Sequence, residues 1–136
     1  MKPIVFAILA FALPAVAAAE SKIIDCATQP ETSISDNKGT FTFKGACKMI
    51  AVEGNENTVS IEQVETLTLP GNRNTAQATK ADAVAVPGNE NTVQVGTTSA
   101  ISAAGNKNTV GWKSAGKKAK PKISNTGNKN KIAKVK

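Results

Sequence analysis

Apolar and polar residues follow a fixed register along most of this chain. The tetrapeptide Gly-Asn-x-Asn recurs with its glycine at positions 54, 71, 88, 105 and 127, so successive repeats are separated by 17, 17, 17 and 22 residues. In the first four repeats, apolar residues stand four and two positions before the glycine, and again five and seven positions after it. Within each pair a single residue separates the apolar positions, which is the alternation of a β-strand. Each repeat therefore predicts two short strands joined by a Gly-Asn-x-Asn bend.

A fixed short period is typical of a solenoid, in which each repeat forms one coil. Helices are disfavoured because the Gly-Asn clusters would interrupt every helical run. We expect an all-β chain folded as a parallel β-solenoid, similar to a β-helix, with about five coils of 17 residues. Successive coils should rise by about 4.8 Å, the strand spacing of a sheet. Right-handed coiling is expected by analogy with parallel crossovers.

Asparagine occupies both fixed polar positions of the bend. Stacked bends place Asn over Asn, so the side-chain amides can form hydrogen bonds from coil to coil, as in cross-β ladders. Glycine and asparagine also tolerate the positive φ that tight bends require. One predicted structural ladder comprises Asn55, Asn72, Asn89, Asn106 and Asn128. The second comprises Asn57, Asn74, Asn91, Asn108 and Asn130.

The first nineteen residues have the pattern of a signal peptide. Lys2 supplies a positive charge, residues 4–13 are apolar, and three alanines at 17–19 give a small-residue cleavage site. The apolar run is too short for a transmembrane anchor. We therefore expect export to the bacterial periplasm or the extracellular space, with no transmembrane segment after residues 1–19 are removed. The remaining residues, 20–136, are enough for one domain.

The chain contains two cysteines, Cys26 and Cys47. An oxidising compartment favours a disulfide between them, and two buried free thiols are the alternative. Residues 20–46 are predicted to form an N-terminal cap, pinned by this disulfide, and a degenerate first coil. In that coil Phe41 and Phe43 occupy the first two apolar strand positions.

Three stretches carry a resemblance to a known family. They are GACKMIAVEGNENTVSI at 45–61, TLTLPGNRNTA at 66–76 and KPKISNTGNKNKI at 120–132. Over residues 41–135 the chain resembles the bacterial exported repeat family called domain of unknown function 3060. This resemblance implies an exported, β-rich repeat domain and brings no established activity or catalytic residues. Residues 71–77 are also similar to curli subunit repeats, but the spacing of the flanking Gln and Ser residues departs from that pattern.

Positive charge is concentrated in the last quarter of the chain. Residues 20–104 include six basic and ten acidic residues, whereas residues 105–136 include ten lysines and no acidic residue. The solenoid repeats at 47–136 contain one lysine-rich insertion, residues 113–122, next to Trp112. The predicted polyanion-binding residues are Lys113, Lys117, Lys118, Lys120 and Lys122.

An exported basic loop of this kind can bind lipopolysaccharide, anionic polysaccharide, phospholipid surfaces or extracellular DNA. The lysine-rich insertion contains no aromatic residue and only Trp112 lies beside it, so sequence-specific recognition of nucleic acid is not expected. The other interpretation is a solvated cap that keeps the solenoid soluble and monomeric.

Candidate catalytic chemistry is sparse. The chain has no histidine and no tyrosine, which excludes Ser-His-Asp and Cys-His arrangements within it. Asparagine stands where calcium-binding repeats carry aspartate, so no metal or other cofactor is expected. We expect a non-enzymatic structural or surface-binding protein of unknown precise role. Two alternatives stay open: a curli-like fibre-forming subunit, and a polysaccharide-active enzyme that uses carboxylates such as Glu53 and Glu56.

Overall fold

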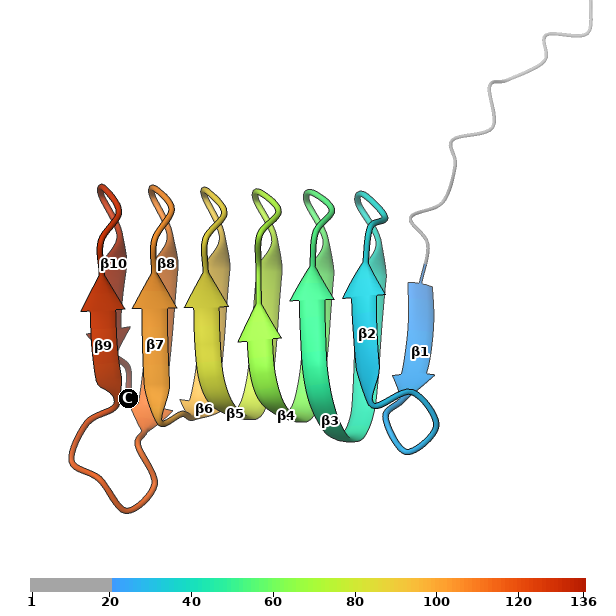
Figure 1. The fold of residues 1–136 in the computed structure, drawn as a ribbon, viewed down its shortest axis with the longest axis horizontal. Helices are drawn as coiled ribbons and strands as arrows, with labels where there is room; N and C mark the ends of the chain where they lie inside the picture. Colours follow the sequence, from blue (N-terminus) through green and yellow to red (C-terminus); the bar gives the residue numbers. More distant parts are fainter. Residues whose placement is uncertain (1–20) are drawn as a thin grey trace, which may run out of the picture.

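The protein is a parallel β-solenoid of about six turns (Figure 1). A computed structural model describes residues 21–136, and the predicted signal peptide lies outside the described residues. Within residues 21–136 there is no helix. The strands are β1 (Ser21–Asp25), β2 (Glu31–Ile34), β3 (Thr40–Val52), β4 (Thr58–Thr68), β5 (Thr75–Val86), β6 (Thr92–Thr97), β7 (Ala100–Ala103), β8 (Thr109–Ser114), β9 (Lys122–Asn125) and β10 (Lys131–Lys134).

The named strands pair in parallel with the corresponding segment of the next coil. One face is built from β1, the first parts of β3, β4 and β5, and then β6, β8 and β10. The other face is built from β2, the last parts of β3, β4 and β5, and then β7 and β9. In Figure 1 the nearer strands run up the page, the farther strands run down, and coils are added from right to left. The coil is therefore right-handed, as expected.

The apolar columns predicted from the repeats form the core. In the coil that follows Gly54, the inward side chains are at most 4% exposed. They are Val59, Ile61, Val64, Leu67 and Leu69. Each stacks on the equivalent residue of the next coil, so Val59 is in register with Ala76 and Leu67 with Val84. Burying one Val or Leu side chain contributes roughly 1.5–3 kcal/mol, so these columns hold adjacent coils together.

The bend obtains its positive φ from a position that the sequence did not single out. The residue after the outer asparagine, here called the x residue, has a φ of 56–58° in every bend, including the first, where Gly39 replaces the inner asparagine. These residues are Lys38, Glu56, Arg73, Glu90, Lys107 and Lys129. The repeat glycines and asparagines are not in the left-handed region, so the expectation that they supply the positive φ is wrong. This conformation costs about 1–2 kcal/mol for an L-residue.

Stacking of the coils holds the x residue in this conformation. The amide of Glu56 donates to the carbonyl oxygen of Asn72 at 3.0 Å, and the amide of Arg73 donates to that of Asn89 at 3.0 Å. The first five of these residues are thus each bonded to the bend of the following coil, and Lys129 belongs to the last bend.

The repeat glycines are needed for close approach of the backbone. A Cβ atom on Gly88 would overlap the carbonyl oxygen of Gly71, and one on Gly105 would overlap that of Gly88. The amide of Gly88 also donates to the carbonyl oxygen of Leu69 at 3.0 Å, which fixes the distance between the two coils. A side chain at this position would therefore push adjacent coils apart.

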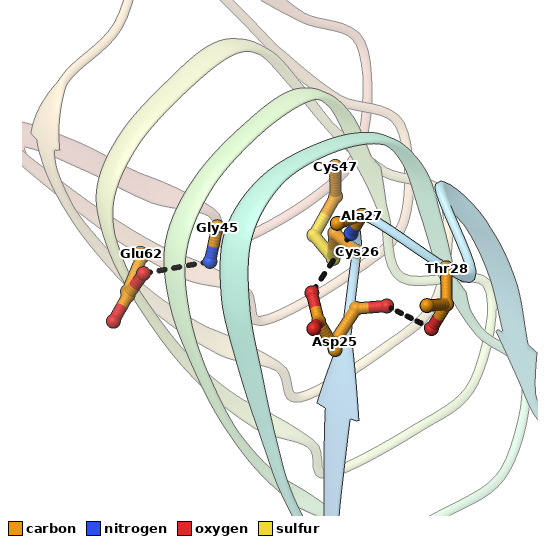
Figure 2. The surroundings of a disulfide bond; sticks show 7 residues. All are labelled: Asp25, Cys26, Ala27, Thr28, Gly45, Cys47 and Glu62. Atoms are coloured by element: carbon orange, nitrogen blue, oxygen red, sulfur yellow. Dashed lines mark hydrogen bonds between the residues drawn. A yellow bond between two sulfur atoms is a disulfide. The ribbon is translucent and has the colours of Figure 1, made fainter.

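The disulfide between Cys26 and Cys47 is present, as predicted (Figure 2). Their Cα atoms are 4.9 Å apart, and both residues are buried. Cys47 lies in register with Val64, so it points into the core. The bond joins the turn after β1 to β3, and it therefore ties the first coil to the second. Residues 21–39 complete a coil that the sequence indicated only as a degenerate one.

Candidate functional site

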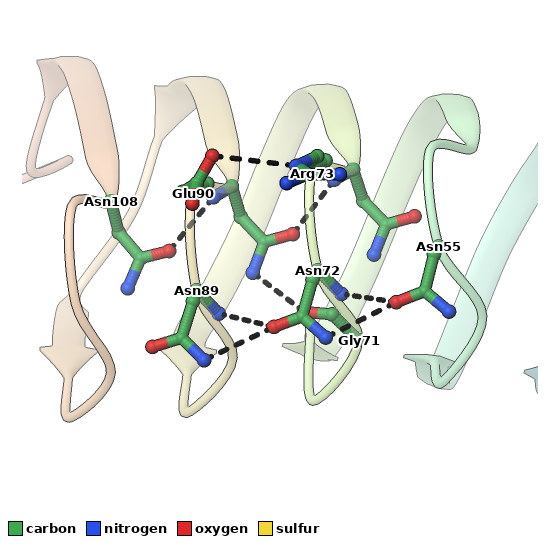
Figure 3. Close-up of polar contacts among 9 residues, drawn as sticks. Asn55, Gly71, Asn72, Arg73, Asn89, Glu90 and Asn108 are labelled. Atoms are coloured by element: carbon green, nitrogen blue, oxygen red, sulfur yellow. Dashed lines mark hydrogen bonds and ion pairs between the residues drawn. The ribbon is translucent and has the colours of Figure 1, made fainter.

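The outer asparagine column lies on the exposed side of the bends. Each side chain bonds to the asparagine of the preceding coil, as Figure 3 shows for Asn55, Asn72 and Asn89. The Nδ2 of Asn72 and the backbone amide of Asn72 both donate to Oδ1 of Asn55, each at 3.1 Å. Asn37 extends this ladder by one member, because Asn55 donates to its Oδ1. At the last step, the backbone amide of Asn128 donates to Oδ1 of Asn106 at 3.1 Å.

The inner asparagine column is bonded differently from the amide-to-amide ladder that the sequence predicted. The Nδ2 of Asn74 donates to the carbonyl oxygen of Gly54 at 2.8 Å. Its Oδ1 accepts from the backbone amide of Asn57 at 2.9 Å. Asn57, Asn74, Asn91 and Asn108 are at most 1% exposed. These amides therefore satisfy buried backbone groups of the preceding coil, which makes the column a structural element.

The x residues form a column of alternating charge. Lys38, Glu56, Arg73, Glu90 and Lys107 change sign at every step, and the alternation ends only with Lys129. Nε of Arg73 lies 3.4 Å from Oε2 of Glu90 in an exposed ion pair. Exposed pairs of this kind contribute about 0–1 kcal/mol. The alternation mainly avoids repulsion between like charges that are about 4.8 Å apart.

The lysine-rich insertion lies at the opposite edge of the solenoid from the bends (Figure 1). Lys113 is near the end of β8, Lys122 begins β9, and the three lysines between them lie on the connecting turn. All five predicted lysines are exposed. Because β8 and β9 lie on different faces, the insertion carries positive charge around this edge.

The turn within the insertion is ordered by local contacts. The amide of Lys118 donates to the carbonyl oxygen of Ala115 at 3.2 Å, and the amide of Gly116 donates to Oγ of Ser114 at 3.1 Å. Gly116 has a φ of 65°, and Ala115 and Pro121 are buried. The insertion is therefore a defined turn that is anchored to the core at both ends.

Trp112 is part of the core and does not belong to the lysine cluster. It is 6% exposed and in register with Val95. Although Trp112 is next to the insertion in the sequence, the alternation of β8 turns its ring inward. Lys134, on β10, approaches the ring, with Nζ 5.6 Å from its centroid.

Within residues 21–136, the lysines of the lysine-rich insertion form no ion pair. The ion pairs found within residues 21–136 are Lys22–Asp36, Arg73–Glu90 and Lys80–Asp82, all of which precede Gly105. Among the described residues, no lysine of the lysine-rich insertion pairs with a carboxylate. These ammonium groups are therefore available to an external anion.

A family model described as protein of unknown function (DUF3060) matches the chain in two overlapping segments, residues 34–82 and 70–129. The chain belongs to this family. The match confirms the resemblance carried by the repeats, and it extends from the end of β2 into the last bend. Neither a curated protein nor a solved structure matches the chain.

The described part of this DUF3060 chain has neither a group of metal-binding side chains nor a membrane-spanning helix. Across residues 21–136, no group of three or more His, Cys, Asp or Glu side chains is placed to hold a metal ion. The same residues contain no helix of the length and apolarity needed to cross a membrane.

A groove that the sequence did not predict runs along the strand face of this DUF3060 chain. It has a volume of about 820 Å³ and crosses β3, β4, β5, β6 and β8. Its lining includes Thr42, Ser60, Gln77 and Gln94 in one column and Glu62, Thr79 and Lys113 in the next, and we call it the polar groove. The alternation of the strands identifies these positions as outward, but it does not show that the surface is concave there.

Proposed function

We propose that this protein is an exported, non-enzymatic binding protein of the bacterial envelope or extracellular space. It contacts anionic polymers through the lysines of its last quarter. The observation that carries this proposal is that ten lysines between residues 105 and 136 have no acidic residue among them. Five of them lie in or beside one exposed, ordered turn.

The solenoid presents this charge on a rigid support. The bends satisfy their own polar groups, and the x column balances its charges over most of its length. The positive potential is therefore restricted to one end of the molecule. Such a potential attracts polyanions over a distance of about one Debye length, which is about 8 Å at physiological ionic strength.

The disulfide supports the export part of the proposal. Bonds of this kind persist in oxidising compartments such as the periplasm. Together with the signal peptide predicted over residues 1–19, the Cys26–Cys47 bond favours a location outside the cytoplasm.

The expected ligand is an anionic surface or polymer, with no preference for nucleotide sequence. Single-stranded nucleic acids are usually held by exposed aromatic side chains on which the bases stack. Trp112 is buried, so the lysine-rich insertion presents no aromatic ring. DNA should therefore bind only through its phosphates, as lipopolysaccharide and phosphatidylglycerol do.

Binding to lipopolysaccharide, to phosphatidylglycerol vesicles and to DNA tests the proposal. The test variant replaces four lysines of the insertion with glutamine: Lys117, Lys118, Lys120 and Lys122. A matched control replaces four lysines of the earlier coils: Lys38, Lys44, Lys48 and Lys80. The wild type and the control should bind at low salt and release at high salt, whereas the test variant should bind weakly.

Two results would contradict the proposal. Equal binding by the test variant would show that the insertion does not make the contact. An absence of binding by the wild type at low salt would leave the lysines as a solvated cap. The proposed binding protein is a monomer, and gel filtration distinguishes a monomer from a curli-like fibre.

A further inference from the structure

The polar groove differs chemically from the bends. Its columns consist mainly of hydroxyl and carboxamide side chains, which both donate and accept hydrogen bonds. In the bends each inner asparagine amide is bonded to the preceding coil, as for Asn74 and Gly54. Within residues 21–136, the side chains of Gln77 and Gln94 form no hydrogen bond. The groove therefore presents free hydrogen-bonding groups on a regular scaffold.

The polar groove includes two charged side chains, one from β4 and one from β8. Glu62 is on β4, and its Oε2 accepts a hydrogen bond from the amide of Gly45 on β3 at 2.6 Å (Figure 2). Lys113 lines the β8 end, beside the lysine-rich insertion. The coils of β5 and β6 between them line the groove with uncharged residues, including Gln77 and Gln94.

Glycine takes the outward position of the two columns on β6 and β8. Gly96 lies in the outward column of Thr79 and contributes no side chain to the wall. Gly111 follows Gln94 in the other column, and a Cβ atom at Gly111 would contact the Gln94 amide. The amide of Gln94 therefore lies over the space that a larger residue at position 111 would fill.

We propose that the polar groove binds a linear polysaccharide that lies along the solenoid axis. Thr42, Ser60, Gln77 and Gln94 present a hydroxyl or carboxamide group on four successive coils, separated by 4.8 Å or so, the spacing of paired strands. One pyranose unit of a linear glycan has a similar length, so successive sugars can meet a hydrogen-bonding group on successive coils.

Other linear ligands fit these features less well. The lining strands are paired with neighbours on both sides, so a peptide cannot add to them as a further strand. An extended peptide repeats its side-chain direction every 6.7 Å or so, which does not match the coil spacing. A nucleic acid needs several cations and stacking rings, whereas Lys113 is the only basic residue of the lining.

This inference goes beyond the proposed function, because it uses uncharged groups of a different face. Binding in the polar groove should persist at high salt, whereas binding to the insertion lysines should not. The aromatic rings of residues 21–136 are buried and add no stacking energy, so each sugar contributes little. Affinity should therefore rise steeply with chain length until the glycan spans the lined coils, about 19 Å for four steps of the strand spacing.

Titration with cello- and chito-oligosaccharides, followed by amide chemical shifts, tests the inference. Cellohexaose or chitohexaose should shift amides of β4, β5 and β6 at both low and high salt, and the matching disaccharides should shift them far less. Replacing both Gln77 and Gln94 with leucine should weaken hexasaccharide binding by roughly tenfold or more, because two amide contacts are lost.

The control is Gln63→Leu, which changes an exposed glutamine of β4 outside the polar groove. It should bind like the wild type, and circular dichroism should show that every variant keeps its β-structure. Failure of the wild type to bind either hexasaccharide would overturn the inference, as would equal binding by the Gln77 and Gln94 double variant. Shifts confined to the lysine-rich insertion would also overturn it, while leaving the proposed function intact.

Discussion

The Gly-Asn-x-Asn bends and the lysine-rich insertion lie on opposite edges of the same coils, and they are built in opposite ways (Figure 1). The bends that begin at Gly54, Gly71, Gly88 and Gly105 each bury an asparagine and leave no space for a Cβ atom at the glycine. The insertion occurs once, exposes its lysines and is ordered by only a few local hydrogen bonds.

This contrast separates residues that stabilise the fold from residues available for function. In a bend, the glycine and the inner asparagine are fixed by the neighbouring coils, so only the x residue can vary freely. On both sides of the insertion the parallel pairing continues, with Trp112 in register with Val95 before it and Ile123 in register with Ile101 after it. The five residues that lengthen this repeat from 17 to 22 therefore change the surface and leave the pairing unchanged. Four substitution experiments test this contrast.

The largest effect is expected from Gly88→Ala. The new Cβ atom would overlap the carbonyl oxygen of Gly71, and neither coil can shift without breaking its parallel pairing. We expect a loss of more than about 4 kcal/mol in the free energy of unfolding, or no folded protein. Denaturant titration measures the loss.

Gly116→Ala is the matched control within the insertion. Its φ of 65° strains an alanine by about 1 kcal/mol, but nothing lies closer than 3.9 Å to the new Cβ atom. Similar losses for the two alanine variants would show that the bend glycines are not closely packed.

The next effect is expected from Asn74→Ala. It removes the partner of the Gly54 carbonyl and of the Asn57 amide, which are left buried and unsatisfied. We expect a loss of about 2 kcal/mol or more. Ser114→Ala in the insertion removes the acceptor of the exposed Gly116 amide, which water can replace, so it should cost less than about 0.5 kcal/mol. Equal losses in thermal unfolding would contradict the contrast.

The fold could be predicted largely because one signal recurs. The alternation around each glycine located β-strands, and the structure confirms the predicted disulfide between Cys26 and Cys47. The left-handed x residue could not be predicted, because Lys, Glu and Arg have no intrinsic preference for positive φ. Contacts between coils impose that conformation.

The sites were less predictable than the fold. The sequence identified the lysines of the insertion, but their nearness to Trp112 in the chain does not show that the ring is buried in the core. The polar groove depends on the curvature of stacked strands. That curvature arises from packing in three dimensions and has no counterpart in the spacing of Ser60, Gln77 and Gln94.

A smaller effect is expected from reversing one charge of the x column. Arg73→Glu would place three glutamates in successive coils, with Glu56 and Glu90 on either side. We expect a loss of about 1 kcal/mol at low ionic strength, because like charges would be about 4.8 Å apart, and a smaller loss in high salt. Arg73→Gln, which removes the ion pair without adding repulsion, is the control. A loss independent of salt would show that Arg73 acts through packing.

The smallest effect on stability is expected from Lys117→Gln, Lys118→Gln and Lys120→Gln combined. These side chains are exposed, and none pairs with a carboxylate within the described residues, so the free energy of unfolding should change by less than about 0.5 kcal/mol. Stability can rise slightly at low salt, because repulsion among the lysines is removed. Binding to phosphatidylglycerol vesicles should nevertheless weaken, and its dependence on salt should become shallower. Parallel denaturant and vesicle-binding titrations would separate the two roles, since a structural role for the insertion predicts that stability and binding fall together.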